Sequence, residues 1–204
     1  MSKNPIIVFE GIEGSGKSLH INNVANYLKK INRKFIRIRE PGGSKNSEKI
    51  RKLILDNKSS FNVNTDLLLY MSARSENINL IKKNYKKKII LIDRFVDSTI
   101  AYQHYGLGVD IKIVNFINKF LLKDIKVTFT FLNLVNSKNM IERLKKRKKL
   151  NRYDKFSTVF YNKVQKGFLN ISKKRNKKYL KINSNLEINF NKKMIINKVK
   201  ELIK

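Results

Sequence analysis

Cysteine is absent from this 204-residue sequence, which excludes disulfide bonds and metal sites built from thiolates. There is also no run of about 18 apolar residues, so we expect neither a membrane span nor a membrane partner. The first apolar run begins at Ile6, so close to the start that we expect no secretory signal sequence. These absences are compatible with a reducing cytoplasm, and we expect a cytoplasmic protein.

Acidic residues are scarce: 15 Asp and Glu stand against 46 Lys and Arg, which gives a net charge of +31. Such a basic chain suggests a nucleic-acid partner. Here the excess is mostly lysine, is spread along the whole chain, and comes with abundant Asn and Ile. Because Lys, Asn and Ile share A/T-rich codons, we attribute the charge to drift in an AT-biased genome and expect no specific nucleic-acid binding.

Proline is rare, and no linker rich in Gly, Pro or Ser interrupts the chain, so we expect one domain spanning 1–204. The strand-like apolar runs are Ile6–Phe9, Phe35–Ile38, Ile89–Ile92, Val127–Leu132 and Tyr179–Ile182. The helix candidates between and after them are Lys17–Ile31, Ser47–Asp56, Thr65–Asn84, Ile111–Leu122, Ser137–Lys149, Thr158–Lys173 and Leu186–Ile203. This alternation predicts an α/β fold: a five-stranded parallel sheet with helices on both faces.

The first strand-like run leads into the pattern G-x-x-x-x-G-K-[ST], which is typical of a phosphate-binding loop between a strand and a helix. Its glycines let backbone N–H groups approach phosphate oxygens, and the N-terminus of the following helix favours an anion. Lys17 would reach the outer phosphates, and the Ser18 hydroxyl would hold Mg²⁺. The residues assigned to nucleotide binding are Gly11, Ile12, Glu13, Gly14, Ser15, Gly16, Lys17 and Ser18.

Two further pairs of residues suit nucleotide chemistry. Asp93 and Arg94 end an apolar strand, where the carboxylate can hold the water shell of Mg²⁺ and the guanidinium a second phosphate. A structural ion pair at the strand end is the alternative. Tyr70 and Arg74 are four residues apart and share a helix face, where they could stack on and hydrogen-bond a flat base. Without other information, an aromatic residue at this spacing is more often part of the core.

The densest basic run covers residues 141–152. It fits a solvated helix face, a nucleic-acid patch, or a lid that brings arginines over transferring phosphates. The run alone does not choose among them.

Together, these motifs resemble those of bacterial thymidylate kinases from one end of the chain to the other. The matching stretches are FEGIEGSGKS at 9–18, REPGG at 39–43, EKIRKLIL at 48–55, LLLYMSAR at 67–74, DRFVDSTIAYQ at 93–103 and RLKKRKKLNRYD at 143–154. The resemblance implies a P-loop kinase fold and, with Mg²⁺, transfer of the γ-phosphoryl group of ATP to dTMP, giving dTDP for dTTP synthesis. It also implies a homodimer formed through helices beside the sheet.

The resemblance assigns roles at the sugar and the phosphates. Glu13 falls where the family contacts the sugar 3′-hydroxyl, and Tyr102 falls where a ring crowds C2′ and disfavours a ribose. Arg51 and Arg94 match arginines that hold the acceptor phosphate. Asp93 matches the acid near Mg²⁺, a metal site that Ser18 would complete.

Roles at the base and the lid follow in the same way. Tyr70 matches the aromatic residue that stacks on thymine, and Arg74 matches the arginine that hydrogen-bonds the base. Thr99 and Gln103 lie where polar residues approach the base. Residues 141–155 match the lid, which contains Arg143, Arg147 and Arg152. Because the phosphate loop has no arginine, the lid must supply the catalytic one; the expected catalytic residues are Lys17, Arg94, Arg147 and Arg152.

The sequence departs from the family pattern at several positions. Tyr70 stands where Phe is usual, so its hydroxyl needs a partner. Lys163 and Gln165 stand where arginine is frequent, and Asn183 replaces an aspartate, on the side expected to contact adenine. Three other functions compete with thymidylate kinase: a kinase for another nucleoside or nucleotide, a nucleic-acid-binding ATPase that uses the basic charge, and a non-catalytic nucleotide-binding protein.

Overall fold

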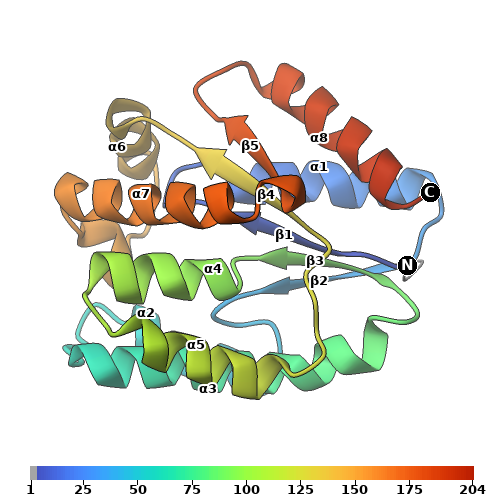
Figure 1. Cartoon of the computed structure of the whole chain (residues 1–204). Helices are drawn as coiled ribbons and strands as arrows, with labels where there is room; N and C mark the ends of the chain where they lie inside the picture. The colour runs from blue at the N-terminus through green and yellow to red at the C-terminus, as the bar shows by residue number, and fades with distance from the viewer. Residues whose placement is uncertain (1–3) are drawn as a thin grey trace.

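The computed structural model describes residues 4–204, which form a parallel sheet covered on both faces by helices (Figure 1). The five strands run in the order β2-β3-β1-β4-β5, and every pairing is parallel. Their bounds are β1 Ile6–Glu10, β2 Phe35–Arg39, β3 Ile89–Asp93, β4 Phe129–Leu134 and β5 Tyr179–Asn183. The predicted five-stranded parallel sheet is therefore confirmed.

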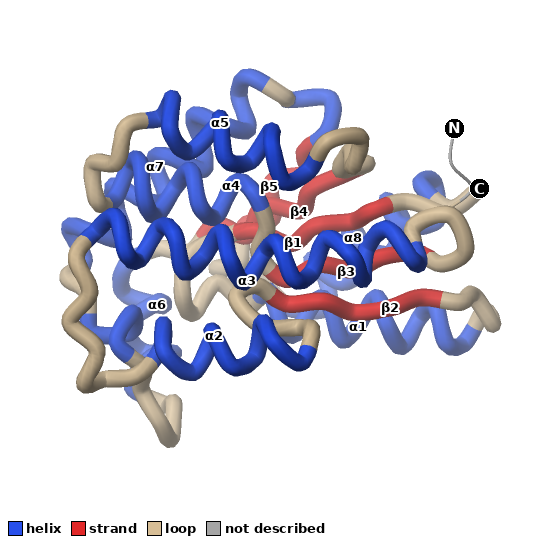
Figure 2. The backbone as a smooth tube through the Cα atoms, turned by 90° about the horizontal axis from the view of Figure 1, so that it is seen from below, coloured by secondary structure: helices blue, strands red, loops and turns tan. Residues whose placement is uncertain are grey.

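Alternate residues of β1 pack against different helices because side chains along a strand point to opposite faces. Ile7 and Phe9 belong to a buried cluster with α1 and α8. Ile6 and Val8 belong to another cluster, which includes residues of α3. Figure 1 shows α1 and α8 above the sheet, and Figure 2 shows α3 crossing in front of the strands when the molecule is seen from below. The helices are α1 Lys17–Lys30, α2 Lys45–Leu55, α3 Val63–Asn84, α4 Val96–Thr99, α5 Ile111–Leu122, α6 Ser137–Lys145, α7 Thr158–Lys174 and α8 Ile188–Leu202.

Several predicted boundaries were wrong for local reasons. Helix α2 begins two residues before the predicted Ser47, because the side chain of Ser44 accepts a hydrogen bond from the Ser47 N–H and caps the helix. Strand β4 begins two residues after the predicted Val127, and Thr128 instead exchanges hydrogen bonds with Ile6 through its backbone N–H and its hydroxyl oxygen.

The predicted helix through the basic run ends early. Helix α6 stops at Lys145, not at Lys149. A short 3₁₀ turn, Arg152–Lys155, follows and begins with a capping box between Asn151 and Asp154. The chain at 141–155 is thus a helix end, a loop and a second short turn.

The stretch after β3 forms a helix that sequence patterns did not predict. Helix α4 continues directly into a π-helical segment, Ile100–Gly106, in which the Leu107 N–H donates to the Tyr102 carbonyl oxygen. A π-helical turn widens the helix and re-aims its side chains, and such turns are frequent at functional sites. Here the turn carries Tyr102 and Gln103 beside the carboxyl ends of the strands.

Candidate active site

The loop between β1 and α1 requires glycine for steric reasons. Gly11 has φ of 140°, and a Cβ there would lie 2.3 Å from the carbonyl oxygen of Asn133 on β4. At the other end of the loop, Gly16 caps α1 in a left-handed conformation with φ of 85°. The helix therefore starts at Lys17 with its first N–H groups turned towards the loop, which is the arrangement that binds phosphate.

Lys17 is folded back onto this loop. Its buried ammonium group donates to the carbonyl oxygens of Gly11 at 2.9 Å and Ile12 at 2.8 Å, and to the Ser15 hydroxyl at 3.3 Å. Burial lowers the pKa of Lys17 to about 7, and the nearby positive charge of Arg94 lowers it further. A polyanion bound at the loop would place an anionic partner beside this ammonium group.

Two oxygen donors meet beside the loop. The Ser18 hydroxyl donates to Asp93 Oδ2 at 3.3 Å, at the end of β3. A hydroxyl and a carboxylate are hard oxygen ligands, and Mg²⁺ is usually held by one or two such groups together with phosphate oxygens and water. Residues 4–204 contain no cluster of three His, Cys, Asp or Glu that could hold a metal by themselves. The donor set therefore fits Mg²⁺ that arrives with a nucleotide.

Arg94 occupies the centre of the site in a strained conformation. Its φ of 64° is unusual for a residue other than glycine. Its guanidinium donates to the Gly11 carbonyl oxygen and to Glu13 Oε1, both at 2.8 Å, and lies over the Tyr102 ring at 5.1 Å. The Tyr102 hydroxyl donates to the other oxygen of Glu13. The residues predicted at the sugar and at the acceptor phosphate are thus in direct contact.

The buried carboxylate of Glu10 holds the backbone after Arg94 in place. It accepts hydrogen bonds from the N–H of Phe95 at 2.8 Å, the N–H of Ser98 at 3.2 Å and the Ser98 hydroxyl at 2.5 Å. Burial and the nearby Asp97 raise the pKa of Glu10 to about 7. Sequence reasoning missed Glu10, although it immediately precedes the glycine-rich pattern.

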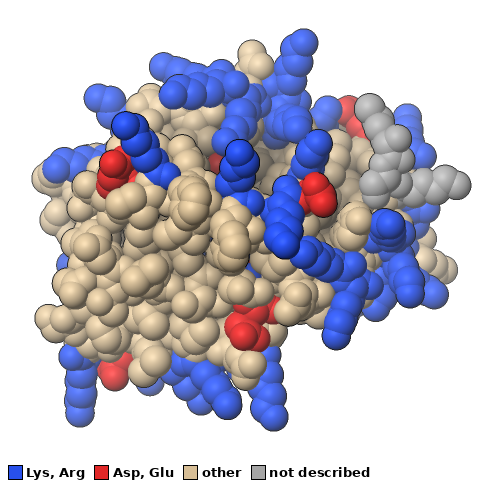
Figure 3. Space-filling model, turned by 60° about the horizontal axis from the view of Figure 1, so that its bottom comes forward, with Lys and Arg blue, Asp and Glu red and all other residues tan. Residues whose placement is uncertain are grey.

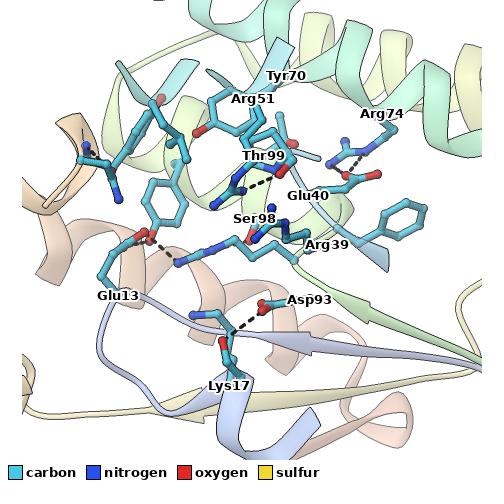
Figure 4. Close-up of a pocket in the computed structure, with 18 of the residues that line it drawn as sticks. Glu13, Lys17, Arg39, Glu40, Arg51, Tyr70, Arg74, Asp93, Ser98 and Thr99 are labelled. Atoms are coloured by element: carbon cyan, nitrogen blue, oxygen red, sulfur yellow. Dashed lines mark hydrogen bonds and ion pairs between the residues drawn. The ribbon is translucent and has the colours of Figure 1, made fainter. Parts of the chain in front are cut away.

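The base end of the site is built around Arg74, which is only 2 % exposed. Its guanidinium forms an ion pair of 2.7 Å with Glu40, donates to Asn118 Oδ1 at 2.7 Å, and lies 5.2 Å from the centre of the Phe95 ring. Figure 4 shows Arg74 against Glu40, with Tyr70 nearby on the same helix. The guanidinium position is therefore set by residues from three other parts of the chain.

A cavity of about 210 Å³ joins the loop to this base end (Figure 4). The predicted site residues that line it are Glu13, Lys17, Ser18, Arg51, Tyr70, Arg74, Asp93, Arg94, Thr99, Tyr102, Gln103 and Arg147. Gly11, Ile12, Gly14, Ser15 and Gly16 do not line it; they form the loop behind Lys17. Arg51 reaches the cavity from α2 and donates to the Pro41 carbonyl oxygen at 2.5 Å.

The arginines of residues 141–155 lie in different places. Arg147 lines the cavity and is paired with Asp154. Arg152 does not line it: its guanidinium forms an ion pair of 2.5 Å with Asp66 at the start of α3. Arg143 donates to the carbonyl oxygens of Gly14 at 2.9 Å and Ser184 at 2.7 Å, which ties α6 to the phosphate loop.

Some lining residues were not predicted. They are Arg39, Glu40, Pro41, Leu55, Phe95, Ser98, Asn151 and Tyr153. The motif REPGG at 39–43 was a usable signal for the first three, because it follows a strand at the edge where ligands collect. Tyr153 packs edge-on against Tyr70, with ring centres 5.8 Å apart. These residues are far apart in the sequence, so no local pattern predicts this contact.

Two departures from the family pattern have structural partners. Gln165 takes part in two hydrogen bonds with Val135, accepting from its N–H at 3.1 Å and donating to its carbonyl oxygen at 3.0 Å. The side chain of Asn183 accepts from the N–H and the side chain of Asn185. Lys163 is exposed. Gln165 and Asn183 therefore support the backbone beside α6 and β5.

Comparisons with known proteins give a consistent result. The family model described as thymidylate kinase matches residues 9–195. The thymidylate kinase of Sulfurihydrogenibium sp. (strain YO3AOP1) is 36 % identical over 198 residues, covering 96 % of each chain. That of Thermosipho africanus is 39 % identical over 171 residues, covering 83 % of this chain and 85 % of the relative. The crystal structure of thymidylate kinase from Ehrlichia chaffeensis matches with a TM-score of 0.77 at 31 % identity, over 97 % of this chain and 98 % of that one.

Proposed function

The chain belongs to the thymidylate kinase family, and from this premise we propose which residues carry the reaction and how the chain assembles. It transfers the γ-phosphoryl group of ATP to dTMP, with Mg²⁺, and produces dTDP for dTTP synthesis. One observation carries the assignment of roles: a single cavity has Lys17, Ser18 and Asp93 at one end and Tyr70 and Arg74 at the other. A nucleoside monophosphate placed along it directs its phosphate towards the loop end, at Arg94 and Arg51, and its base towards Arg74.

The loop end binds the phosphoryl donor. The backbone N–H groups of Gly11–Ser18 hold phosphate oxygens, and Lys17 leaves its contacts with the loop carbonyls to pair with the outer phosphates. Ser18 and Asp93 would hold Mg²⁺, which would neutralise phosphate charge. No protein nucleophile is needed, because alignment and neutralisation of charge supply the catalysis.

Arg94 and Arg51 hold the acceptor phosphate from two sides of the cavity. Glu13 orients the guanidinium of Arg94 and, together with Tyr102, forms a polar wall that receives the sugar 3′-hydroxyl. A ring at the position of Tyr102 leaves little room for a 2′-hydroxyl, which disfavours ribonucleotides. The backbone of Arg94 adopts a left-handed conformation, which costs conformational free energy and directs the side chain towards the loop.

The base lies against Tyr70 and accepts a hydrogen bond from Arg74, with Thr99 and Gln103 beside it. Arg74 is already held by Glu40, so little conformational freedom is lost when it binds a ligand.

Residues 141–155 act as a lid over the transferring phosphoryl group. Arg147 is the lid arginine nearest the reaction, since it lines the cavity and its partner Asp154 is in the same segment. Arg152 joins it only if it leaves Asp66 on closure. Closure also excludes water and so limits hydrolysis of ATP.

Replacement of Arg94 tests this assignment. Arg94→Ala should lower turnover of dTMP by at least about a hundredfold, because a guanidinium aimed at transferred charge is lost. Arg37→Ala removes an exposed arginine from β2 and serves as the matched control, for which we expect turnover close to that of wild type. ADP formation with ATP and dTMP is the measurement. Equal effects of the two substitutions would contradict the assignment.

The chain forms a homodimer through the outer surfaces of α3 and α5. On α5, Ile113, Phe116 and Phe120 are exposed, with Phe116 73 % and Phe120 66 % accessible, and Leu68 is exposed on α3. Figure 3 shows a broad uncharged surface on the side of the molecule that carries these helices, with lysines and arginines around it. An apolar surface of this kind is typical of an interface. Phe116→Ser with Phe120→Ser should shift the chain to a monomer in analytical ultracentrifugation, whereas a monomeric wild type would contradict the dimer.

We further propose that residues 1–204 act as one kinase domain in the cytoplasm and bind no nucleic acid specifically. In residues 4–204, no helix is long and apolar enough to cross a membrane. On the face shown in Figure 3, the positive charge lies around the uncharged surface instead of forming one stripe. Binding to a polynucleotide should therefore be weak and lost at moderate salt.

A further inference from the structure

A second cavity, of about 330 Å³, lies on the sheet face that is covered by α3, α4 and α5. Its floor includes Val8 of β1 and Thr130 of β4, which are partners in the strand register. Phe95 lines both this cavity and the substrate cavity. The volume is within the lower part of the range of small-molecule sites.

The mouth of this second cavity is basic. Lys126, Arg175 and Lys178 line it and are exposed. Arg175 forms an ion pair of 3.3 Å with Asp97, and Asp97 also accepts a hydrogen bond from the Tyr179 hydroxyl. The Asp97 carboxylate therefore already has two partners. Lys126 and Lys178 form no ion pair with any residue in 4–204. Their charge is available to an anion that enters the mouth.

Further in, the lining is mixed. Glu10 and Thr130 contribute polar groups, and Glu10 already accepts hydrogen bonds from Phe95 and Ser98. Ile100, Leu122 and Ile125 supply apolar surface. Asn118 lines the same cavity and is 4 % exposed. Its oxygen must face Arg74, because a guanidinium only donates hydrogen bonds. Its Nδ2 then points elsewhere and has no hydrogen-bond partner within the described chain, which is costly for a buried donor.

We propose that the second cavity binds a small organic anion with an apolar body and a hydrogen-bond acceptor, and that this ligand strengthens the hold of Arg74 on the base. The anionic group lies at Lys126 and Lys178, the apolar body lies against Ile100 and Leu122, and the acceptor pairs with Nδ2 of Asn118. With both ends of its amide bonded, Asn118 keeps its oxygen on Arg74. Coupling to dTMP rests on the proposed role of Arg74, whereas binding of the anion does not.

The coupling has a reciprocal consequence. If the anion raises the affinity for dTMP by some factor, dTMP raises the affinity for the anion by the same factor. The cavity is also independent of the proposed dimer surface. Asn115, Asn118 and Leu122 line it from one side of α5, while the exposed Phe116 and Phe120 lie on the other side. An occupant therefore does not compete with a second copy of the chain.

The test uses 4-acetylbenzoate, whose carboxylate suits the mouth and whose carbonyl suits Asn118. 4-Isopropylbenzoate has nearly the same shape without the acceptor and is the matched control ligand. Affinities are measured by ligand-observed NMR titration of the full chain, with and without saturating dTMP. We expect the acetyl compound to bind about fivefold more tightly than the isopropyl compound, and more tightly still with dTMP present.

Variants separate this site from general attraction to a basic surface. Lys126→Gln with Lys178→Gln should weaken 4-acetylbenzoate binding about fivefold and leave turnover of dTMP unchanged. Lys192→Gln removes an exposed lysine on α8, on the opposite face of the sheet, and should change neither. Asn118→Asp keeps an acceptor for Arg74 and removes the donor, so it should abolish the difference between the two ligands.

Equal binding of the two ligands to wild type, or equal effects of the mouth and α8 variants, would overturn the site. Unchanged affinity in the presence of dTMP would overturn the coupling. A wild-type chain that binds 4-acetylbenzoate as expected but does not phosphorylate dTMP would instead count against the assigned reaction, so the two failures are distinguishable.

Discussion

Nucleotide binding to the free enzyme should take up a proton above neutral pH, and Lys17 should be the group that takes it. The ammonium group of Lys17 is buried among carbonyl oxygens and lies near Arg94, which holds its pKa at about 7. When phosphates bind at the loop, the opposite charge beside Lys17 favours the protonated form. The pKa then rises towards the ordinary lysine value of about 10.4.

The size of the uptake follows from the two pKa values. At pH 8, one unit above the lowered pKa, only about one-tenth of the free enzyme carries the proton on Lys17. The complex is almost fully protonated there, so binding takes up about 0.9 proton. At pH 6 the free enzyme is already about nine-tenths protonated, and the uptake falls to about 0.1 proton.

Calorimetric titration with ADP in buffers of different ionisation enthalpy measures this uptake directly. At pH 8 the ADP phosphates are fully ionised and contribute nothing. Lys17→Met, titrated at concentrations that saturate its weaker site, should lose the uptake, and Lys29→Met, an exposed lysine of the same helix, should keep it. An uptake near zero at pH 8 in wild type, or the same uptake in Lys17→Met, would refute the reasoning.

Three other outcomes are expected. Gly11→Ala should abolish ATP-dependent turnover, because its Cβ would lie 2.3 Å from the Asn133 carbonyl oxygen and the loop would have to shift. Turnover is the measurement, circular dichroism checks that the chain is folded, and an active variant would contradict the prediction. Glu40→Gln should lower the free energy of unfolding by about 1–3 kcal/mol and raise KM for dTMP, because Arg74 loses its buried charged partner. Urea denaturation measures the first effect and initial rates measure the second. An unchanged KM would argue against the role of Arg74. The difference in free energy of unfolding between wild type and Lys17→Met should rise by about 2 kcal/mol between pH 7 and 9. The reason is that the unfolded chain keeps the Lys17 proton over this range, whereas the folded chain loses it. A difference that does not change with pH would contradict the lowered pKa of Lys17.

The fold was largely predictable from the sequence because its central strands are continuous apolar runs. Ile89–Ile92 is buried throughout, and the alternation of such runs with helix-length segments favours a parallel sheet. Helix ends were less predictable. The cap at Ser44 and the π-helical turn at Ile100–Gly106 rest on local hydrogen bonds that hydrophobic periodicity does not encode.

The site divides in the same way. Residues in local motifs, such as Lys17 beside the loop glycines, were predicted and line the cavity. Asn118 was missed because its contact with Arg74 joins positions 44 residues apart, and nothing near it in the sequence marks it as different from other asparagines. For Arg152, the basic residues around it in the sequence predict a lid residue. In the structure it pairs with Asp66, which lies 86 residues away and which no local pattern connects to it. Only the folded chain brings these pairs together.

The most direct measurement is the initial rate of ADP formation with ATP, Mg²⁺ and each nucleoside monophosphate in turn. The account predicts turnover with dTMP well above that with dAMP, dGMP or dCMP, and with the ribonucleotide UMP strongly disfavoured by the ring of Tyr102. A rate that does not depend on the acceptor, but increases when a polynucleotide is added, would contradict the account and make the net charge of +31 the main clue to function.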